Sequence, residues 1–165
     1  MGRKGFNTYL IKIFCAQTTN AQFVQWFYDL GTITRGLPVH YWIENNTLQN
    51  PFYQQVFMPL FCEIGKRMGY LIITRPDTRK KPDKFTRIEG TLEPPVRAGV
   101  LIFNEVEKGN PQMETAVGQF KSVSPTFRGA IDAPDAVEGG YYILDMNMAA
   151  RAGTFRAQKR PNRKY

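Results

Sequence analysis

Short apolar runs alternate along this chain with longer stretches of helical periodicity. The apolar runs are rich in β-branched and aromatic residues and end at polar or turn residues, which is typical of strands. Strands are therefore predicted over residues 6–17, 36–45, 70–76 and 100–105. Helices are predicted over residues 18–31, 50–69, 81–99, 110–123 and 132–151. Strands that alternate with helices predict an α/β domain with a largely parallel sheet.

Glycine and proline refine these boundaries. Gly31 is expected to end the first helix, and Pro59 to kink the second. The pair Pro94-Pro95 is expected to break the helix over 81–99. Residues 2–5, GRKG, precede the first strand and predict a hairpin turn.

One predicted strand ends on a carboxylate. The apolar run Val39–Ile43 is expected to be buried, and Glu44 follows it directly. In open α/β sheets, ligands bind outside the carboxyl ends of the strands. Glu44 is therefore a candidate site residue, and the alternative is a carboxylate that is solvated or caps the next helix.

A second acidic feature lies in the sequence RGAIDAPDAVEGG. Asp132 and Asp135 are three residues apart at a predicted helix start, which is the arrangement of a capping pair favoured by the helix dipole. The functional alternative is that they turn toward Glu44 and bind a divalent cation, because Mg²⁺ prefers carboxylate oxygens and keeps several waters. Paired ions of this kind promote phosphodiester cleavage.

A basic segment begins just past the third predicted strand, at the same edge of the sheet as Glu44. Its cationic side chains are Arg75, Arg79, Lys80, Lys81, Lys84 and Arg87. They form either a solvated loop and helix face or a rim that grips phosphate groups. Their place beside the carboxylates makes DNA binding a specific hypothesis.

Composition narrows the classes of function. The net charge of +8 lies mostly in residues 151–165, which carry six basic residues and no acid, while the preceding residues are nearly balanced. Such a tail is typical of disordered segments and also binds phosphate backbones by counterion release. The sequence has no apolar stretch long enough to span a membrane, no secretory signal and no glycine-rich phosphate loop of the Walker type.

Three segments together resemble a known family. The segments are WIENNTLQNPF (42–52), RPDTRKKPDKFTRIEGTLEPPVRAGVLIFNE (75–105) and DAPDAVEGGYYIL (132–144). They are similar to the C-terminal nuclease domain of the large terminase subunit of tailed bacteriophages. The resemblance covers about residues 6–145, and DTRKKPDKFTRIE and DAPDA are its most specific parts.

The resemblance implies a ribonuclease H-like fold, which is a mixed sheet flanked by helices, and a function. Domains of this family cut concatemeric viral DNA into packaging lengths with Mg²⁺ or Mn²⁺ held by three acidic positions. Glu44 matches the second position and Asp132 the third, with Asp135 as its neighbour. Ala130 and Ile131 depart from the pattern, because many relatives have His and Asp there.

The same resemblance implies partners and a location. They are double-stranded DNA, the terminase ATPase part, the small terminase subunit and the portal, in the host bacterial cytoplasm and without a membrane.

The largest departure from the family lies at the N-terminus. The first catalytic Asp of the family is on a strand that precedes the hairpin, and in this chain no acid occurs before Asp29. The first strand and the ATPase motor are therefore expected to be absent from this chain. A sheet that lacks a strand is expected to have an open edge beside residues 6–14, which favours pairing with another chain.

The sequence thus predicts a ribonuclease H-like nuclease domain over residues 1–150, followed by a basic tail over 151–165. The main alternative is a non-catalytic DNA-binding or assembly module, such as a prophage remnant of that domain. Another ribonuclease H-like nuclease, such as a junction resolvase, is the alternative among enzymes.

Overall fold

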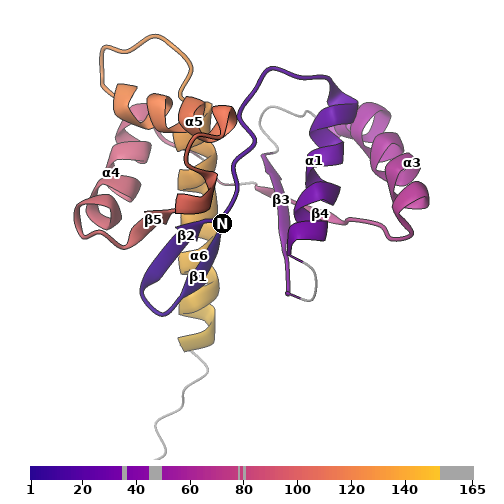
Figure 1. The fold of residues 1–165 in the computed structure, drawn as a ribbon, viewed down its shortest axis with the longest axis horizontal. Coiled ribbons are helices and arrows are strands. Elements are labelled where there is room, and N and C mark those ends of the chain that lie inside the picture. Colours follow the sequence, from indigo (N-terminus) through magenta and orange to yellow (C-terminus); the bar gives the residue numbers. More distant parts are fainter. Residues whose placement is uncertain (35–36, 45–49, 78, 80, 153–165) are drawn as a thin grey trace, which may run out of the picture.

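The computed structural model describes residues 1–34, 37–44, 50–77, 79 and 81–152, and its architecture is α/β (Figure 1). The helices are α1 (Asn20–Ile33), α2 (Asn50–Phe52), α3 (Met58–Met68), α4 (Lys84–Arg97), α5 (Pro111–Ser122) and α6 (Asp132–Ala152). The strands are β1 (Gly2–Lys4), β2 (Asn7–Leu10), β3 (Tyr41–Glu44), β4 (Thr74–Asp77) and β5 (Leu101–Phe103). Lys80 and residues 153–165 of the predicted tail lie outside the described residues. The tail was predicted to begin at residue 151, but α6 continues to Ala152.

In the described residues the strands form two small sheets, a mixed one and a parallel pair, so the expectation of a single sheet is wrong. The first sheet has the order β1-β2-β5, and the second consists of β3 and β4. β1 and β2 are antiparallel and meet at a turn that contains Gly5, whose φ of 60° favours glycine. β2 and β5 are parallel, as are β3 and β4.

The strands are shorter than the apolar pattern predicts. β2 ends at Leu10 instead of continuing to residue 17. The hairpin predicted at residues 2–5 is present, with its turn at Gly5 and Gly2–Lys4 as its first strand. Of the run Val39–Ile43, only Ile43 is buried, whereas Val39 is 36% exposed. An apolar run of this length identifies a strand but does not set its ends.

Both sheets have unpaired edges in the described part of the chain, at β1 and β5 in the first sheet and at β3 and β4 in the second. β2 pairs with β1 on one side and with β5 on the other, so the open edge predicted beside residues 6–14 is not there. β3 pairs only with β4. Each sheet therefore ends in a strand whose backbone groups can accept a further strand.

The helix boundaries are predicted better than the strand boundaries, because the residues that cap a helix are its neighbours in the sequence. Thr19 accepts a hydrogen bond from the backbone N–H of Gln22 at the start of α1. Gly69 ends α3 in the left-handed conformation, with a φ of 80°. The predicted kink near Pro59 coincides with a π-helical turn, Tyr53–Phe57, immediately before α3.

Two helix predictions are wrong. α1 continues past Gly31, its predicted end, to Ile33. α4 runs through Pro94 and Pro95 to Arg97 without a break. The prolines lie in its last turn, where the backbone N–H groups of Ala98 and Val100 donate to the carbonyls of Pro94 and Pro95. The helix therefore loses few hydrogen bonds to the two rings.

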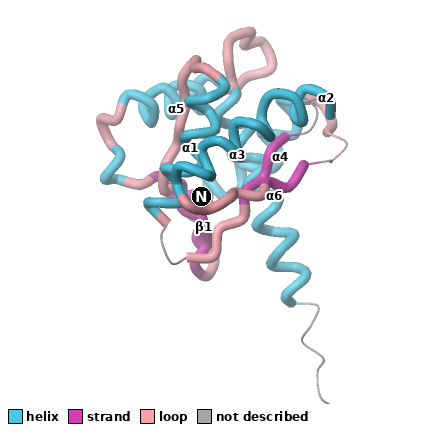
Figure 2. Tube along the Cα trace, turned by 90° about the vertical axis from the view of Figure 1, so that its right-hand side faces the viewer, coloured by secondary structure: helices cyan, strands magenta, loops and turns pink. Residues whose placement is uncertain are grey.

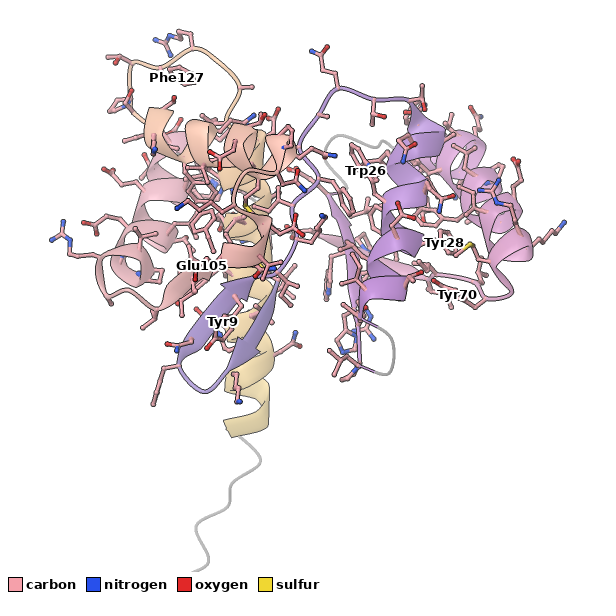
Figure 3. The ribbon with its side chains drawn as sticks, in the orientation of Figure 1. Tyr9, Trp26, Tyr28, Tyr70, Glu105 and Phe127 are labelled. Atoms are coloured by element: carbon pink, nitrogen blue, oxygen red, sulfur yellow. The ribbon has the colours of Figure 1, made fainter. Side chains whose placement is uncertain are left out.

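Each sheet has its own apolar core. One core lies among α1, α3 and the β3–β4 sheet and includes Tyr28, whose hydroxyl donates to the carbonyl of Phe61 at 2.7 Å. Figure 3 shows Tyr28 and Tyr70 close together between α1 and α3, with ring centroids 5.3 Å apart. The second core brings together Leu10, Ile88 and Val137 from β2, α4 and α6. The lower turns of α6 extend past the remainder of the fold (Figure 2).

Candidate functional site

Two carboxylates meet at the carboxyl ends of β3 and β4. Glu44 is the last residue of β3 and Asp77 the last residue of β4, and the parallel register pairs them directly. Neighbouring parallel strands end at the same edge of a sheet, which is where ligands bind in α/β folds. The prediction that Glu44 closes a strand is confirmed.

Lys81 bridges these two carboxylates. Its ammonium nitrogen lies 2.7 Å from Glu44 Oε1 and 3.5 Å from Asp77 Oδ2, and the Lys81 side chain is largely buried. A single positive charge therefore occupies the point where the two acids converge.

Arg79 joins β4 to α6. Its guanidinium donates to Asp77 Oδ2 at 2.9 Å and to Glu138 Oε1 at 3.1 Å. Tyr142, one turn beyond Glu138 on α6, places its ring 4.2 Å from the Arg79 guanidinium carbon. Gly139 leaves room for this approach, because a Cβ there would lie 3.3 Å from Arg79 Nη2.

Two cations of α4 face three acids of α6. Arg87 donates to Glu138 Oε2 and, at 2.6 Å, to Asp135 Oδ1. Lys84 lies 3.2 Å from Asp132 Oδ1 and 3.3 Å from Asp135 Oδ2. Lys84 thus bridges a second pair of carboxylates, as Lys81 bridges the first.

These contacts form one continuous ion-pair network that crosses between the two sheets. Its members are Glu44, Asp77, Arg79, Lys81, Lys84, Arg87, Asp132, Asp135 and Glu138. The network brings the predicted metal ligands and most of the predicted DNA-binding residues into one place. It also neutralises them, because each predicted carboxylate is paired with a predicted cation.

The pairing sets the pKa values within the network. Burial alone would raise the pKa of Asp77, but hydrogen bonds from Arg79 and the charges of Arg79 and Lys81 outweigh it and hold the pKa below its ordinary value. Burial likewise acts to raise the pKa of Asp135, and Arg87 and Lys84 lower it overall. The pKa of Lys84 is raised, since Asp132 and Asp135 outweigh the desolvation that would lower it. Asp77 and Asp135 are therefore ionised at neutral pH.

The remaining predicted residues have different surroundings. The Asp132 side chain is 79% exposed, so its ion pair with Lys84 is open to solvent. Arg75 lies outside the network, with its guanidinium carbon 5.9 Å from the centre of the Trp42 ring. Lys80 is not among the described residues.

The carboxylate oxygens of the network fit a divalent metal ion such as Mg²⁺ only in part. Each bridging ammonium marks a point where two carboxylates converge, and carboxylate oxygens are what Mg²⁺ and Mn²⁺ prefer. However, within residues 1–34, 37–44, 50–77, 79 and 81–152, no three acidic, histidine or cysteine side chains form a group that could hold a metal ion. Glu44, Asp132 and Asp135 are thus linked through cations and do not form a common metal-binding group.

Two central members of the network were not predicted. Asp77 and Glu138 are both buried, and Glu138 is only 1% exposed. The signal was present in the spacing: Lys84 and Arg87 are three apart on α4, and Asp132, Asp135 and Glu138 repeat every three residues on α6. Residues three apart share a helix face, so the two helices present complementary charges to each other.

Comparisons with known proteins give no match: no family model, curated protein or solved structure is similar to this chain. In the described part of the chain, no helix has the length and apolar content needed to cross a membrane.

Proposed function

We propose that this chain is a ribonuclease H-like, metal-dependent DNA endonuclease domain of a viral packaging terminase, which cuts concatemeric phage DNA in the host bacterial cytoplasm. The observation that carries the proposal is the convergence of Glu44 and Asp77 on one cation at the carboxyl ends of two parallel strands. The resemblance of the surrounding segments to terminase nuclease domains supports the identity of the substrate.

Each predicted residue has a role in this proposal. Glu44, Asp132 and Asp135 would hold Mg²⁺ or Mn²⁺, with Asp77 beside Glu44. The metal would activate a water and stabilise the leaving oxygen of the phosphodiester. Lys81 and Lys84 would occupy the points between the paired carboxylates until the cation replaces them. Freed from these pairs, Lys81 and Lys84 would contact the DNA backbone together with Arg75, Arg79, Lys80 and Arg87.

The free sheet edges support an incomplete nuclease domain. β1, β3, β4 and β5 each lack a partner on one side in the described residues, and the two sheets remain separate. A strand that bore a carboxylate and paired with one edge of each sheet would join the sheets into one. We propose that another segment or chain supplies it, for example from the terminase ATPase part, with the small subunit and the portal as further partners.

Metal binding tests the proposal. We expect Mn²⁺ to bind the purified chain and the Glu44→Ala variant to lose about tenfold or more in affinity, because one charged ligand contributes at least ~1.4 kcal/mol. Isothermal titration calorimetry measures this directly. The matched control is Glu63→Ala, since Glu63 is an exposed acid on α3. Equal Mn²⁺ affinity of all three proteins would refute a metal role for Glu44.

Activity on DNA is expected to be weak for this chain alone. It should bind duplex DNA with a strong salt dependence and nick supercoiled plasmid slowly or not at all in Mg²⁺, because the described residues form no group of three metal-binding side chains. Gel assays across a salt series measure both properties. Rapid Mg²⁺-dependent nicking that Glu44→Ala abolishes would show that the site needs no further residue.

One observation favours a different function, a non-catalytic DNA-binding or assembly module. Every predicted metal ligand already forms an ion pair with a lysine or arginine, so the charges are balanced without a metal. In that case the network serves to hold the two sheets together. Absence of Mn²⁺ binding, together with unchanged DNA affinity on Glu44→Ala, would favour this alternative.

A further inference from the structure

A cavity opens beside the ion-pair network, against α4 and α6. Its volume is about 550 Å³, which is large enough for a nucleotide. The residues that line it include Arg79, Lys81, Arg87, Gly90, Thr91 and Glu138. None of the predicted metal ligands Glu44, Asp132 and Asp135 lines it.

The charge of this lining is positive. Arg79, Lys81 and Arg87 carry three positive charges, and Glu138 is the one acid among the described residues that line the cavity. Asp77 and Asp135, which neutralise the two arginines, do not line it. An anion in the cavity therefore meets three cations, and the one carboxylate in the described lining is Glu138, which pairs with Arg79 and Arg87.

Arg87 has an unused donor. The side chain of Arg87 is 7% exposed, and its terminal nitrogens donate to Asp135 and Glu138. Its Nε–H is buried and has no hydrogen-bond partner. A buried donor without a partner is costly, and such groups are rare in folded proteins. An acceptor oxygen in the cavity reaches this donor only if the Arg87 side chain shifts, because the Nε atom is closed off from solvent.

We propose that this cavity binds the phosphate group of a nucleotide. Arginine guanidinium groups recognise phosphate through charge-assisted hydrogen bonds, and Lys81 adds a point charge. The Thr91 hydroxyl at the cavity wall is a further donor. The phosphate belongs either to a free nucleotide or to a DNA strand. For a DNA strand the inference rests on the proposed function, which assigns the same three cations to the DNA backbone. For a free nucleotide it goes beyond that function, and in both cases it requires no metal and no cleavage.

Gly90 provides a test that leaves the ion pairs intact. It lines the cavity on α4, and a Cβ built on it meets no atom within 4 Å. Gly90→Leu therefore places a side chain into open space and fills part of the cavity, and Gly90→Glu adds a repelling carboxylate. Gly118 on α5 also has open space around its Cβ position but does not line the cavity, so Gly118→Leu and Gly118→Glu are matched controls.

The experiment is a calorimetric titration in EDTA with adenosine monophosphate, adenosine, inorganic phosphate and short single strands of DNA. We expect the monophosphate to bind at least about tenfold more tightly than adenosine, which corresponds to one charge-assisted hydrogen bond. Both Gly90 variants should lose this preference, and both Gly118 variants should keep it. Circular dichroism establishes that each variant is folded.

The arms of the titration separate the two sources of phosphate. Binding of the monophosphate without the single strands indicates a free nucleotide, and stronger binding of the strands indicates DNA. Equal affinity for adenosine and its monophosphate, or full phosphate binding by folded Gly90→Glu, overturns the proposal. Because EDTA excludes metals, this result is independent of the Mn²⁺ titration that tests the nuclease function.

Discussion

Glu138→Ala is expected to lower the free energy of unfolding by about 3 kcal/mol, because removing one partner of a buried ion pair leaves the other charges uncompensated. Glu138 is 1% exposed and accepts hydrogen bonds from both Arg79 and Arg87. We place the loss at the lower end of the usual ~3–5 kcal/mol, since Asp77 and Asp135 still neutralise the two arginines. Urea denaturation of the purified variant measures the loss.

The matched control for this prediction is Glu89→Ala. Glu89 is an exposed acid on α4, so its removal should change the free energy of unfolding by less than about 0.5 kcal/mol. A double variant, Glu138→Leu with Arg87→Met, should recover part of the loss, because an apolar pair of similar volume replaces buried charges at little cost. A loss below about 1 kcal/mol for Glu138→Ala would mean that water reaches this carboxylate in solution.

The sequence predicts the helices of this chain well and its sheets poorly, for a physical reason. Helix ends depend on neighbouring residues, such as Thr19 at the start of α1 and Gly69 at the end of α3. Strand pairing depends on residues far apart in the chain: Thr8 pairs with Leu101. No local pattern indicates that the β3–β4 pair remains separate from the other sheet.

The candidate site was predicted in its members but not in its arrangement. Glu44, Asp132 and Asp135 were predicted to converge on a metal, and six basic residues to bind DNA from the same edge. Four of the six, Arg79, Lys81, Lys84 and Arg87, belong to the network. The structure pairs these two sets with each other, through contacts such as Lys81 with Glu44 and Arg87 with Asp135. Sequence alone does not give the partner of a charged side chain. Residues 81 and 44 are far apart in the chain, and the pairing of β3 with β4 brings them together.

The network suggests how a metal would enter this site. Lys81 and Lys84 each bridge two carboxylates, and each carries one positive charge where a divalent cation would carry two. A metal must therefore compete with a bound ammonium group. The central claim of our account is that Lys81 occupies a cation position between Glu44 and Asp77.

Lys81→Met is consequently expected to strengthen Mn²⁺ binding about tenfold or more. The ammonium group lies within about 4 Å of both carboxylates, and removing a unit charge at that distance changes the interaction by ~1–4 kcal/mol between water and a partly buried environment. The methionine side chain keeps most of the apolar stem of lysine but not its charge. The control is Lys66→Met, because Lys66 is exposed on α3 and is not a member of the network.

The most direct measurement is a calorimetric Mn²⁺ titration of the wild-type chain, Lys81→Met, Lys66→Met, and Lys81→Met combined with Glu44→Ala. Our account predicts the tightest binding for Lys81→Met, wild-type affinity for Lys66→Met, and loss of the gain when Glu44 is also replaced. Unchanged or weaker Mn²⁺ binding by folded Lys81→Met would contradict it, since Lys81 would then not occupy a cation site.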